Sequence, residues 1–271
     1  MVATGGLAGM VCALSDEGDE HRPLLTLEGL VLGVIEVGFL ADRVSPVIDG
    51  PAGAGKTTVS RMLAERLGYR YVDTGALYRG VAYEVKQQGI NPEDENELAE
   101  LCRRLQLGFR TEAKGLRLYS GETDISDRIR SPEISMLASS VSASAVVREY
   151  LLDVQRDIGL RKAAVFEGRD MGTVVFPRAD VKFFLNAALA TRALRRYREL
   201  DSKSGQSLHK VEEDMQHRDI SDSTRSLAPL KPADDAIVID STDLSVQQVV
   251  DQMLLHISEK GYQIDYKGSY S

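Results

Sequence analysis

The feature that most constrains this chain is a glycine-rich turn, GPAGAGKT at residues 50–57, which fits the pattern G-x-x-x-x-G-K-[ST]. The turn directly follows a short apolar run, Val44–Asp49, which has the composition of a buried strand. It leads directly into Thr57–Leu67, where apolar residues recur at helical spacing. A strand, a glycine-rich turn and a helix in this order predict a phosphate-binding loop.

The residue types in this turn suit the binding of a polyphosphate. Gly53 and Gly55 permit backbone conformations and close approaches that a β-carbon would block. Successive N–H groups would then point into one concavity at the positive end of the following helix. Lys56 is placed to reach the β- and γ-phosphates of a nucleotide, and the Thr57 hydroxyl is placed to ligate Mg²⁺. The predicted phosphate-binding residues are Gly50, Pro51, Ala52, Gly53, Ala54, Gly55, Lys56, Thr57 and Thr58.

Beyond the turn, short apolar strands alternate with amphipathic helices. The predicted strands are Val44–Asp49, Tyr69–Val72, Ala163–Phe166, Val181–Leu185 and Ala236–Ile239, with a further small β element at Leu116–Tyr119. The predicted helices are Thr57–Leu67, Ala76–Gln88, Pro92–Leu105, Pro132–Gly159, Ala187–Leu200, Leu208–Ile220 and Ser245–Glu259. This alternation favours an α/β fold, with a five-stranded parallel sheet flanked by helices on both faces.

Charge and composition divide the chain near residue 43. Residues 1–44 hold seven acidic and two basic residues, although the net charge of the whole chain is only −8. This segment is also rich in glycine and poorly periodic. We therefore predict a weakly ordered extension at 1–43, with a regulatory or docking arm as the alternative. Residues 44–265 are predicted to form one domain and residues 266–271 a polar tail.

The composition argues against several classes of function. The 33 basic and 41 acidic residues predict no broad basic surface for duplex nucleic acid, and 6% aromatic residues without tryptophan offer few stacking platforms. Cys12 and Cys102 have no metal-ligand or disulfide spacing, which is typical of a reducing compartment. The longest apolar run, Gly29–Leu40, is shorter than the roughly 20 residues that span a membrane. We therefore expect a cytoplasmic protein without nucleic-acid or membrane partners.

Five motifs carry a resemblance that is more specific than the turn alone. They are IDGPAGAGKT at 48–57, DTGALYR at 73–79, EGRDMGTVVFP at 167–177, RDISDSTR at 218–225 and APL at 228–230. With these motifs in this order, residues 45–260 resemble bacterial cytidylate kinase, a family that transfers a phosphoryl group from ATP to CMP or dCMP. The resemblance implies a nucleoside monophosphate kinase core with an insert at about 80–160 and a lid at about 190–206. It also implies use of ATP with Mg²⁺, and a monomer.

An acceptor of this kind brings a second phosphate dianion beside ATP, and the two would repel each other. Guanidinium groups grip phosphate through paired hydrogen bonds, so convergent arginines are expected. The basic helix at 187–200 supplies Arg192, Arg195 and Arg196 at helical spacing on one face, whereas we interpret Arg198 as a solvated charge. The acceptor phosphate is already largely dianionic at neutral pH, so no general base is required. The predicted catalytic residues are Lys56, Arg169, Arg195 and Arg196.

The resemblance also implies binding roles at matching positions. Thr74 and Arg79 match residues that contact the CMP phosphate in the family, and Arg169 and Arg225 resemble further phosphate ligands. The residues that match contacts to the cytosine edge are Ser139, Arg148 and Asp170, and those that match sugar contacts are Arg218 and Asp222. Cytosine offers an amino donor beside two acceptors, so a hydroxyl, a guanidinium and a carboxylate are chemically suitable partners.

One position departs from the family pattern, and two other interpretations stay open. Glu167 stands where many family members have aspartate, so its support of Mg²⁺ through water depends on the reach of a longer side chain. The first alternative is another small-molecule kinase, acting on AMP, UMP or shikimate. The second is a nucleotide-binding regulatory module without phosphoryl transfer, which the presence of Arg79, Arg169, Arg218 and Arg225 argues against.

Overall fold

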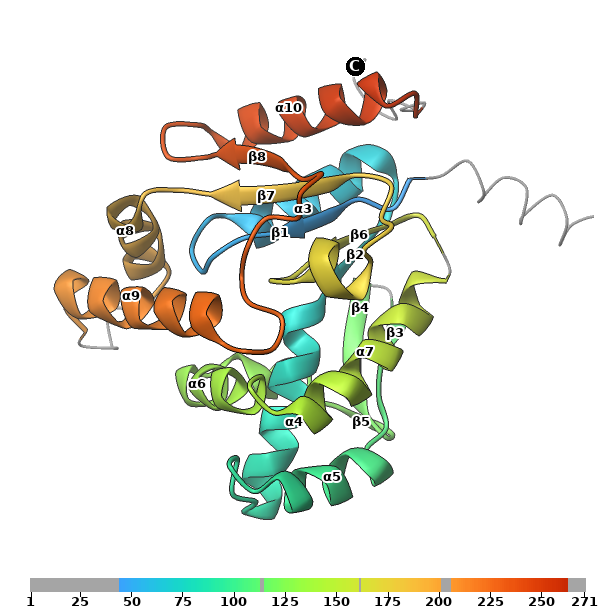
Figure 1. Cartoon of the computed structure of the whole chain (residues 1–271), viewed down its shortest axis with the longest axis vertical. Coiled ribbons are helices and arrows are strands. Elements are labelled where there is room, and N and C mark those ends of the chain that lie inside the picture. The colour runs from blue at the N-terminus through green and yellow to red at the C-terminus, as the bar shows by residue number, and fades with distance from the viewer. Residues whose placement is uncertain (1–43, 113–114, 161, 201–205, 263–271) are drawn as a thin grey trace, which may run out of the picture. The chain divides into compact units, whose positions relative to one another are not determined.

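The computed structural model describes residues 44–112, 115–160, 162–200 and 206–262 (Figure 1). The predicted extension at 1–43, the predicted tail at 266–271 and part of the predicted lid, residues 201–205, lie outside the described residues. In the part of the chain that is described, no helix has the length and apolar character needed to cross a membrane.

Five parallel strands form the central sheet, in the order β2-β6-β1-β7-β8 (Figure 1). The strands are β1 Val47–Asp49, β2 Arg70–Asp73, β6 Ala164–Glu167, β7 Lys182–Asn186 and β8 Ile237–Asp240. Ile48 of β1 pairs with Glu167 on one side and with Phe183 on the other, so β1 is the central strand. The predicted α/β fold with a five-stranded parallel sheet is confirmed. β1 begins at Val47 rather than Val44, and the other four strands of this sheet each lie one residue further along than predicted.

The helices belong to two parts of the structure. Those of the core are α3 Lys56–Leu67, α8 Leu189–Glu199, α9 Leu208–Thr224 and α10 Val246–Glu259, with the π-helix η2 Met171–Val175. Those between β2 and β6 are α4 Thr74–Gln88, α5 Glu95–Arg104, α6 Pro132–Val141 and α7 Ala145–Gly159, with the short 3₁₀ helix η1 Arg128–Arg130.

Alternate residues of the strands pack on opposite faces of the sheet. Ile48 and Val165 lie in a buried cluster with side chains of α3 and α10. Val47 and Phe166, the neighbouring residues along the same strands, lie in a second cluster with η2, and side chains of α7 pack against it. Both faces are therefore buried, as the continuous apolar strands of a parallel sheet require.

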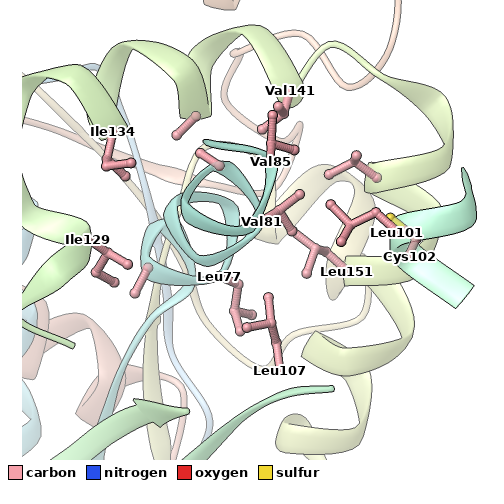
Figure 2. Close-up of a cluster of buried hydrophobic side chains, with 14 of the residues drawn as sticks. Leu77, Val81, Val85, Leu101, Cys102, Leu107, Ile129, Ile134, Val141 and Leu151 are labelled. Carbon is pink, nitrogen blue, oxygen red and sulfur yellow. The ribbon is translucent and has the colours of Figure 1, made fainter. Parts of the chain in front are cut away.

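The segment between β2 and β6 forms an insert with its own core. A three-stranded antiparallel sheet, in the order β3-β4-β5, packs there with α4 to α7. Its strands are β3 Leu107–Glu112, β4 Gly115–Ser120 and β5 Thr123–Asp124. Figure 2 shows Leu77, Val81 and Val85 of α4 pointing into this core, where Leu151 of α7 is also fully buried. Burying each such side chain stabilises the fold by about 1.5–3 kcal/mol.

The predicted single helix at 132–159 is wrong, because α6 and α7 are separate helices. The Ser142 hydroxyl donates to the Ser139 carbonyl at 2.8 Å, just where α6 ends. The Ser144 hydroxyl accepts from the N–H of Val147 at 3.4 Å and caps α7. Serine side chains compete for backbone groups and favour helix ends, while the apolar spacing continues through the break and hides it.

Candidate active site

The glycine-rich turn forms a tight loop between β1 and α3, and α3 begins at Lys56 as part of the turn motif. Gly50 has a φ of 147°, and a β-carbon there would lie 2.0 Å from the Leu185 carbonyl oxygen of the neighbouring strand. Gly53 has a φ of 73°, and its β-carbon would meet the Arg192 carbonyl at 3.0 Å. Glycine is therefore required at both positions by close backbone packing as well as by conformation.

Lys56 is the cation held at the centre of the loop. The residue is 7% exposed, and its Nζ donates to the Pro51 carbonyl at 2.7 Å. Burial, together with the nearby Arg169 guanidinium, lowers the pKa of Lys56 well below its usual value. A phosphate at the loop would oppose that shift, because an anion favours the charged ammonium.

The basic helix α8 braces the loop from outside. Arg192 is buried, donates to the Ala52 carbonyl at 3.2 Å and pairs with Asp219 of α9 at 2.7 Å. Arg195 donates to the Ala54 carbonyl at 3.4 Å and to the Ser241 carbonyl at 2.6 Å. Arg192 thus holds the loop without lining the cavity that faces it, whereas Arg195, Arg196 and Arg198 line that cavity.

One cavity of about 690 Å³ joins the loop to the remaining predicted residues. Every predicted site residue except Gly50 and Pro51 lines it. Its cationic side chains among the described residues are Lys56, Arg79, Arg148, Arg169, Arg195, Arg196, Arg198, Arg218 and Arg225. Its carboxylates are Asp73, Glu167, Asp170, Glu199 and Asp222. This excess of positive charge in an otherwise acidic protein indicates a site for anions.

Thr57 and Glu167 form the acidic corner of the loop. The Thr57 hydroxyl donates to Glu167 Oε1 at 2.8 Å, so the longer acid reaches the motif hydroxyl directly. Glu167 Oε2 is buried without a hydrogen-bond partner among the described residues. Burial, and next the charge of Asp73, raises the pKa of Glu167. A hydroxyl oxygen beside an unsatisfied carboxylate oxygen is a donor set that fits Mg²⁺.

The amino end of α4 forms one wall of the other half of the cavity. Asp73 caps the helix by accepting from the N–H of Ala76 at 3.1 Å, and it pairs with Arg79 at 2.6 Å. The Thr74 hydroxyl is buried and donates to the Glu167 carbonyl at 2.7 Å. Thr74 and Arg79 therefore lie at one side of the cavity, next to the acidic corner.

A buried ion pair joins the insert to the core. Arg148 of α7 pairs with Asp170, which directly precedes η2, and also donates to the Ser142 carbonyl at 3.1 Å. The Arg148 Cζ atom lies 5.6 Å from the ring centroid of Tyr78, whose pKa burial raises to about 12. The break between α6 and α7 thus supplies a carbonyl that orients Arg148. Ser139 lines the same end of the cavity.

Asp222 is the centre of an arginine cluster. Its carboxylate accepts from Arg169 Nε at 3.1 Å, and it lies 4.0 Å from Arg218 and 3.9 Å from Arg225. Burial and the neighbouring Arg169 lower the pKa of Arg218 to about 10. Arg218 Nε and Arg225 Nη2 are buried without hydrogen-bond partners in the described part of the chain. The single carboxylate leaves these donors unsatisfied, which favours a polyanionic ligand.

Sequence reasoning missed an apolar wall of the cavity and one aromatic side chain. Tyr78 lies within the DTG motif and received no role. Leu244, Val246 and Val249 line the cavity beyond the loop, next to Ser241, which donates to the Ala54 carbonyl at 3.0 Å. These four residues follow the carboxyl end of β8. Because the carboxyl ends of parallel strands meet at one edge of the sheet, the predicted strand at 236–239 could have indicated that they lie near the loop.

The fold and the site define a class: an α/β nucleotide-binding protein in which a phosphate-binding loop faces an arginine-lined anion site. The sequence profile of the family described as cytidylate kinase matches residues 47–259. The chain belongs to the cytidylate kinase family.

Two named cytidylate kinases agree with this assignment. The cytidylate kinase of Geobacter sulfurreducens is 46% identical over 214 residues, which are 79% of this chain and 92% of the relative. The cytidylate kinase of Thermotoga neapolitana is 42% identical over 79% of this chain and 96% of the relative. Among solved structures, the shikimate kinase of Acinetobacter baumannii in complex with shikimate is more remote, at 16% identity and a TM-score of 0.44 over 84% of this chain and 99% of that one.

Proposed function

We propose that the protein transfers the γ-phosphoryl group of ATP to CMP or dCMP, giving ADP and CDP or dCDP, and so serves pyrimidine nucleotide supply. The observation that carries this proposal is the single cavity in which the loop faces the arginine cluster around Asp222. Family membership supports the choice of substrates. We expect a monomer that acts in the cytoplasm.

ATP would occupy the side of the cavity that holds the loop. The loop N–H groups and Lys56 would bind its phosphates, and the apolar wall of Leu244, Val246 and Val249 would face its base. Arg195 contacts both the loop and Ser241, so it can meet the phosphates at this side of the cavity.

The acceptor would occupy the other side. Its phosphate would take the unsatisfied donors of Arg218 and Arg225, with Arg79, Arg169 and Thr74 around it. Asp222 would then be free to accept from the sugar hydroxyls. At the far end, the buried pair of Arg148 and Asp170, with Ser139, offers both donors and an acceptor to the cytosine edge.

Mg²⁺ would be held by Thr57, with Glu167 supporting it. When bound with ATP, the ion supplies charge that neutralises the transferred phosphoryl group. The buried Oε2 of Glu167, which has no hydrogen-bond partner among the residues that the structure describes, and the Thr57 hydroxyl support this placement.

The chain's own contribution to catalysis is positioning and charge stabilisation. The acceptor oxygen is already ionised near neutral pH, so no side chain needs to remove a proton. Lys56, Arg169, Arg195 and Arg196 would stabilise the charge that develops between the two substrates. Closure of the lid around α8 would exclude water and so prevent loss of the phosphoryl group to hydrolysis.

The test is release of ADP in a coupled assay over a panel of acceptors: CMP, dCMP, AMP, UMP and shikimate. The proposal predicts that CMP and dCMP have much the highest kcat/KM. Preference for AMP, UMP or shikimate would overturn the choice of acceptor. ATP binding without any transfer would favour the regulatory-module alternative.

A further inference from the structure

The motif at 228–230 has no role in the site described above, yet it follows the helix that carries Arg218, Asp222 and Arg225. Ala228 has a backbone φ of 48°, in the left-handed region that favours glycine. The proline at 229 makes this conformation of Ala228 still less favourable, because the residue before a proline is restricted to extended conformations. Such a conformation persists only where the surrounding structure imposes it, and it is often found at functional sites.

Two hydrogen bonds impose this conformation. The Leu230 N–H donates to the Asp222 carbonyl at 2.7 Å and closes the turn onto the end of α9. The Arg225 Nε donates to the Ala228 carbonyl, also at 2.7 Å. The acceptor in the second bond belongs to the strained residue itself. The left-handed conformation therefore directs one carbonyl at one guanidinium.

That guanidinium has a donor without a hydrogen-bond partner among the described residues. The Arg225 side chain is 11% exposed, and its Nη2 is buried with no hydrogen-bond partner in the described residues. Its Nη1 lies 3.9 Å from Asp222, too far for a hydrogen bond. Arg225 lines the cavity along with Arg148 and Asp170. Nε is thus the guanidinium atom that the protein holds, whereas Nη2 has no hydrogen-bond partner among the described residues.

We propose that Ala228 is a positioning residue, whose carbonyl fixes the Arg225 guanidinium so that its Nη atoms face the phosphate of the acceptor nucleotide. This inference rests on the proposed function, in which Arg225 binds that phosphate. Ala228 then controls affinity for CMP and leaves affinity for ATP unchanged, because Arg225 makes no contact with the phosphate-binding loop among the interactions described here.

Ala228→Val tests the turn, because a β-branched residue is strongly disfavoured at positive φ. The carbonyl should turn away from Arg225, and the KM for CMP should rise roughly 10-fold, the value of one hydrogen bond to a charged group. The KM for ATP should not change. Ala228→Gly allows the left-handed conformation and should have the same KM for CMP as the wild type. Ala233→Val, in the same connection at an ordinary φ, is the matched control.

A double-mutant cycle separates positioning from general damage to the fold. If Ala228 acts through Arg225, adding Ala228→Val to Arg225→Ala should cause no further rise in the KM for CMP. Three results would overturn the inference. They are an equal rise in the KM for CMP in the wild-type and Arg225→Ala backgrounds, a rise in the KM for ATP, and an unchanged KM for CMP when Ala228→Val is made in the wild type. If the valine variant does not fold by circular dichroism, Ala228→Thr is measured instead and judged by the same outcomes. Wild-type protein that does not phosphorylate CMP would instead overturn the proposed function.

Discussion

The two sides of the cavity are built in different ways. The phosphate-binding part of the ATP side is one continuous segment at 50–58, and its carbonyls are held by Lys56, Arg192 and Arg195. The acceptor side is assembled from side chains of α4, α6, α7, the segment before η2, and α9 with its end. There the arginines are paired with Asp73, Asp170 and Asp222, or have donors without a partner in the described part of the chain.

This difference teaches where binding energy and specificity come from. The loop has a fixed backbone shape that any nucleotide triphosphate can use. The acceptor side must exchange internal ion pairs for contacts with the ligand, so an acceptor that lacks matching groups would leave buried charges unpaired. Selectivity should therefore come from the acceptor side, and substitutions that damage one side at a time can separate the two contributions.

The largest effect is expected at the ATP side. Lys56→Ala removes the buried ammonium that would contact the transferred phosphoryl group, so kcat should fall roughly 10³-fold or more. Steady-state ADP release with saturating CMP measures the effect. Lys86→Ala, on the exposed face of α4 and paired with Glu133, is the control and should retain full activity. A Lys56→Ala enzyme with near-normal kcat would contradict this role.

At the acceptor side, a large effect is expected on the KM for the acceptor rather than on kcat. Asp170→Ala leaves Arg148 buried without its partner and removes the carboxylate that would meet the cytosine amino group. The KM for CMP and dCMP should rise roughly 100-fold or more, while the KM for ATP stays unchanged. Asp153→Ala, an exposed position on α7, is the control. Unchanged use of CMP would remove the assignment of base recognition to Asp170.

Asp49 ties the two sides together and should make stability depend on pH. It directly precedes the loop, and its carboxylate accepts from the N–H groups of Met171 at 2.9 Å and Gly172 at 2.8 Å, just after Asp170. Burial raises the pKa of Asp49 from its usual 3.8 to about 6. The folded protein therefore keeps a proton that the unfolded chain releases. The stability this proton contributes is present at low pH and is lost as pH rises through about 6.

Asp49→Asn, which does not titrate, reveals this loss. The free energy of unfolding of wild type relative to the variant should fall by up to about 3 kcal/mol between about pH 4 and about pH 7. Urea denaturation at each pH measures it. A difference that stays constant with pH would show that Asp49 does not titrate in this range.

The smallest effect concerns the metal. Glu167→Asp shortens the acid that now reaches the Thr57 hydroxyl at 2.8 Å. The Mg²⁺ concentration for half-maximal activity should rise by up to roughly 10-fold, with kcat at saturating Mg²⁺ little changed. Mg²⁺ titrations of both enzymes make the comparison. Identical titration curves would mean that Glu167 does not support the ion.

Local sequence signals predicted the core fold well. The strands and most helices follow from apolar periodicity and from the turn at 50–57, because each of these signals lies within one element. The break between α6 and α7 and the strand β3 were missed. The first depends on serine hydroxyls that bond to nearby backbone groups, and the second on pairing with β4.

The candidate site shows the same difference between local signals, which were predicted, and contacts between elements, which were not. The residues predicted from motifs gather in the cavity, except Gly50 and Pro51, but the partners of their side chains were not predicted. Nothing local indicates that Arg192 would brace the loop, that Arg148 would pair with Asp170, or that Arg225 would be held by the Ala228 carbonyl. The first two contacts join residues of different elements, and the third depends on the turn that the Leu230 N–H closes onto the end of α9, so only the assembled fold determines them.

The most direct test of the two-sided site is isothermal titration calorimetry of CMP, and separately of a non-hydrolysable ATP analogue with Mg²⁺, on two variants. Lys56→Ala should lose affinity for the ATP analogue and keep affinity for CMP. Asp170→Ala should do the reverse. If either variant lost affinity for both ligands equally, the two sides would not be separate sites and the account would be wrong.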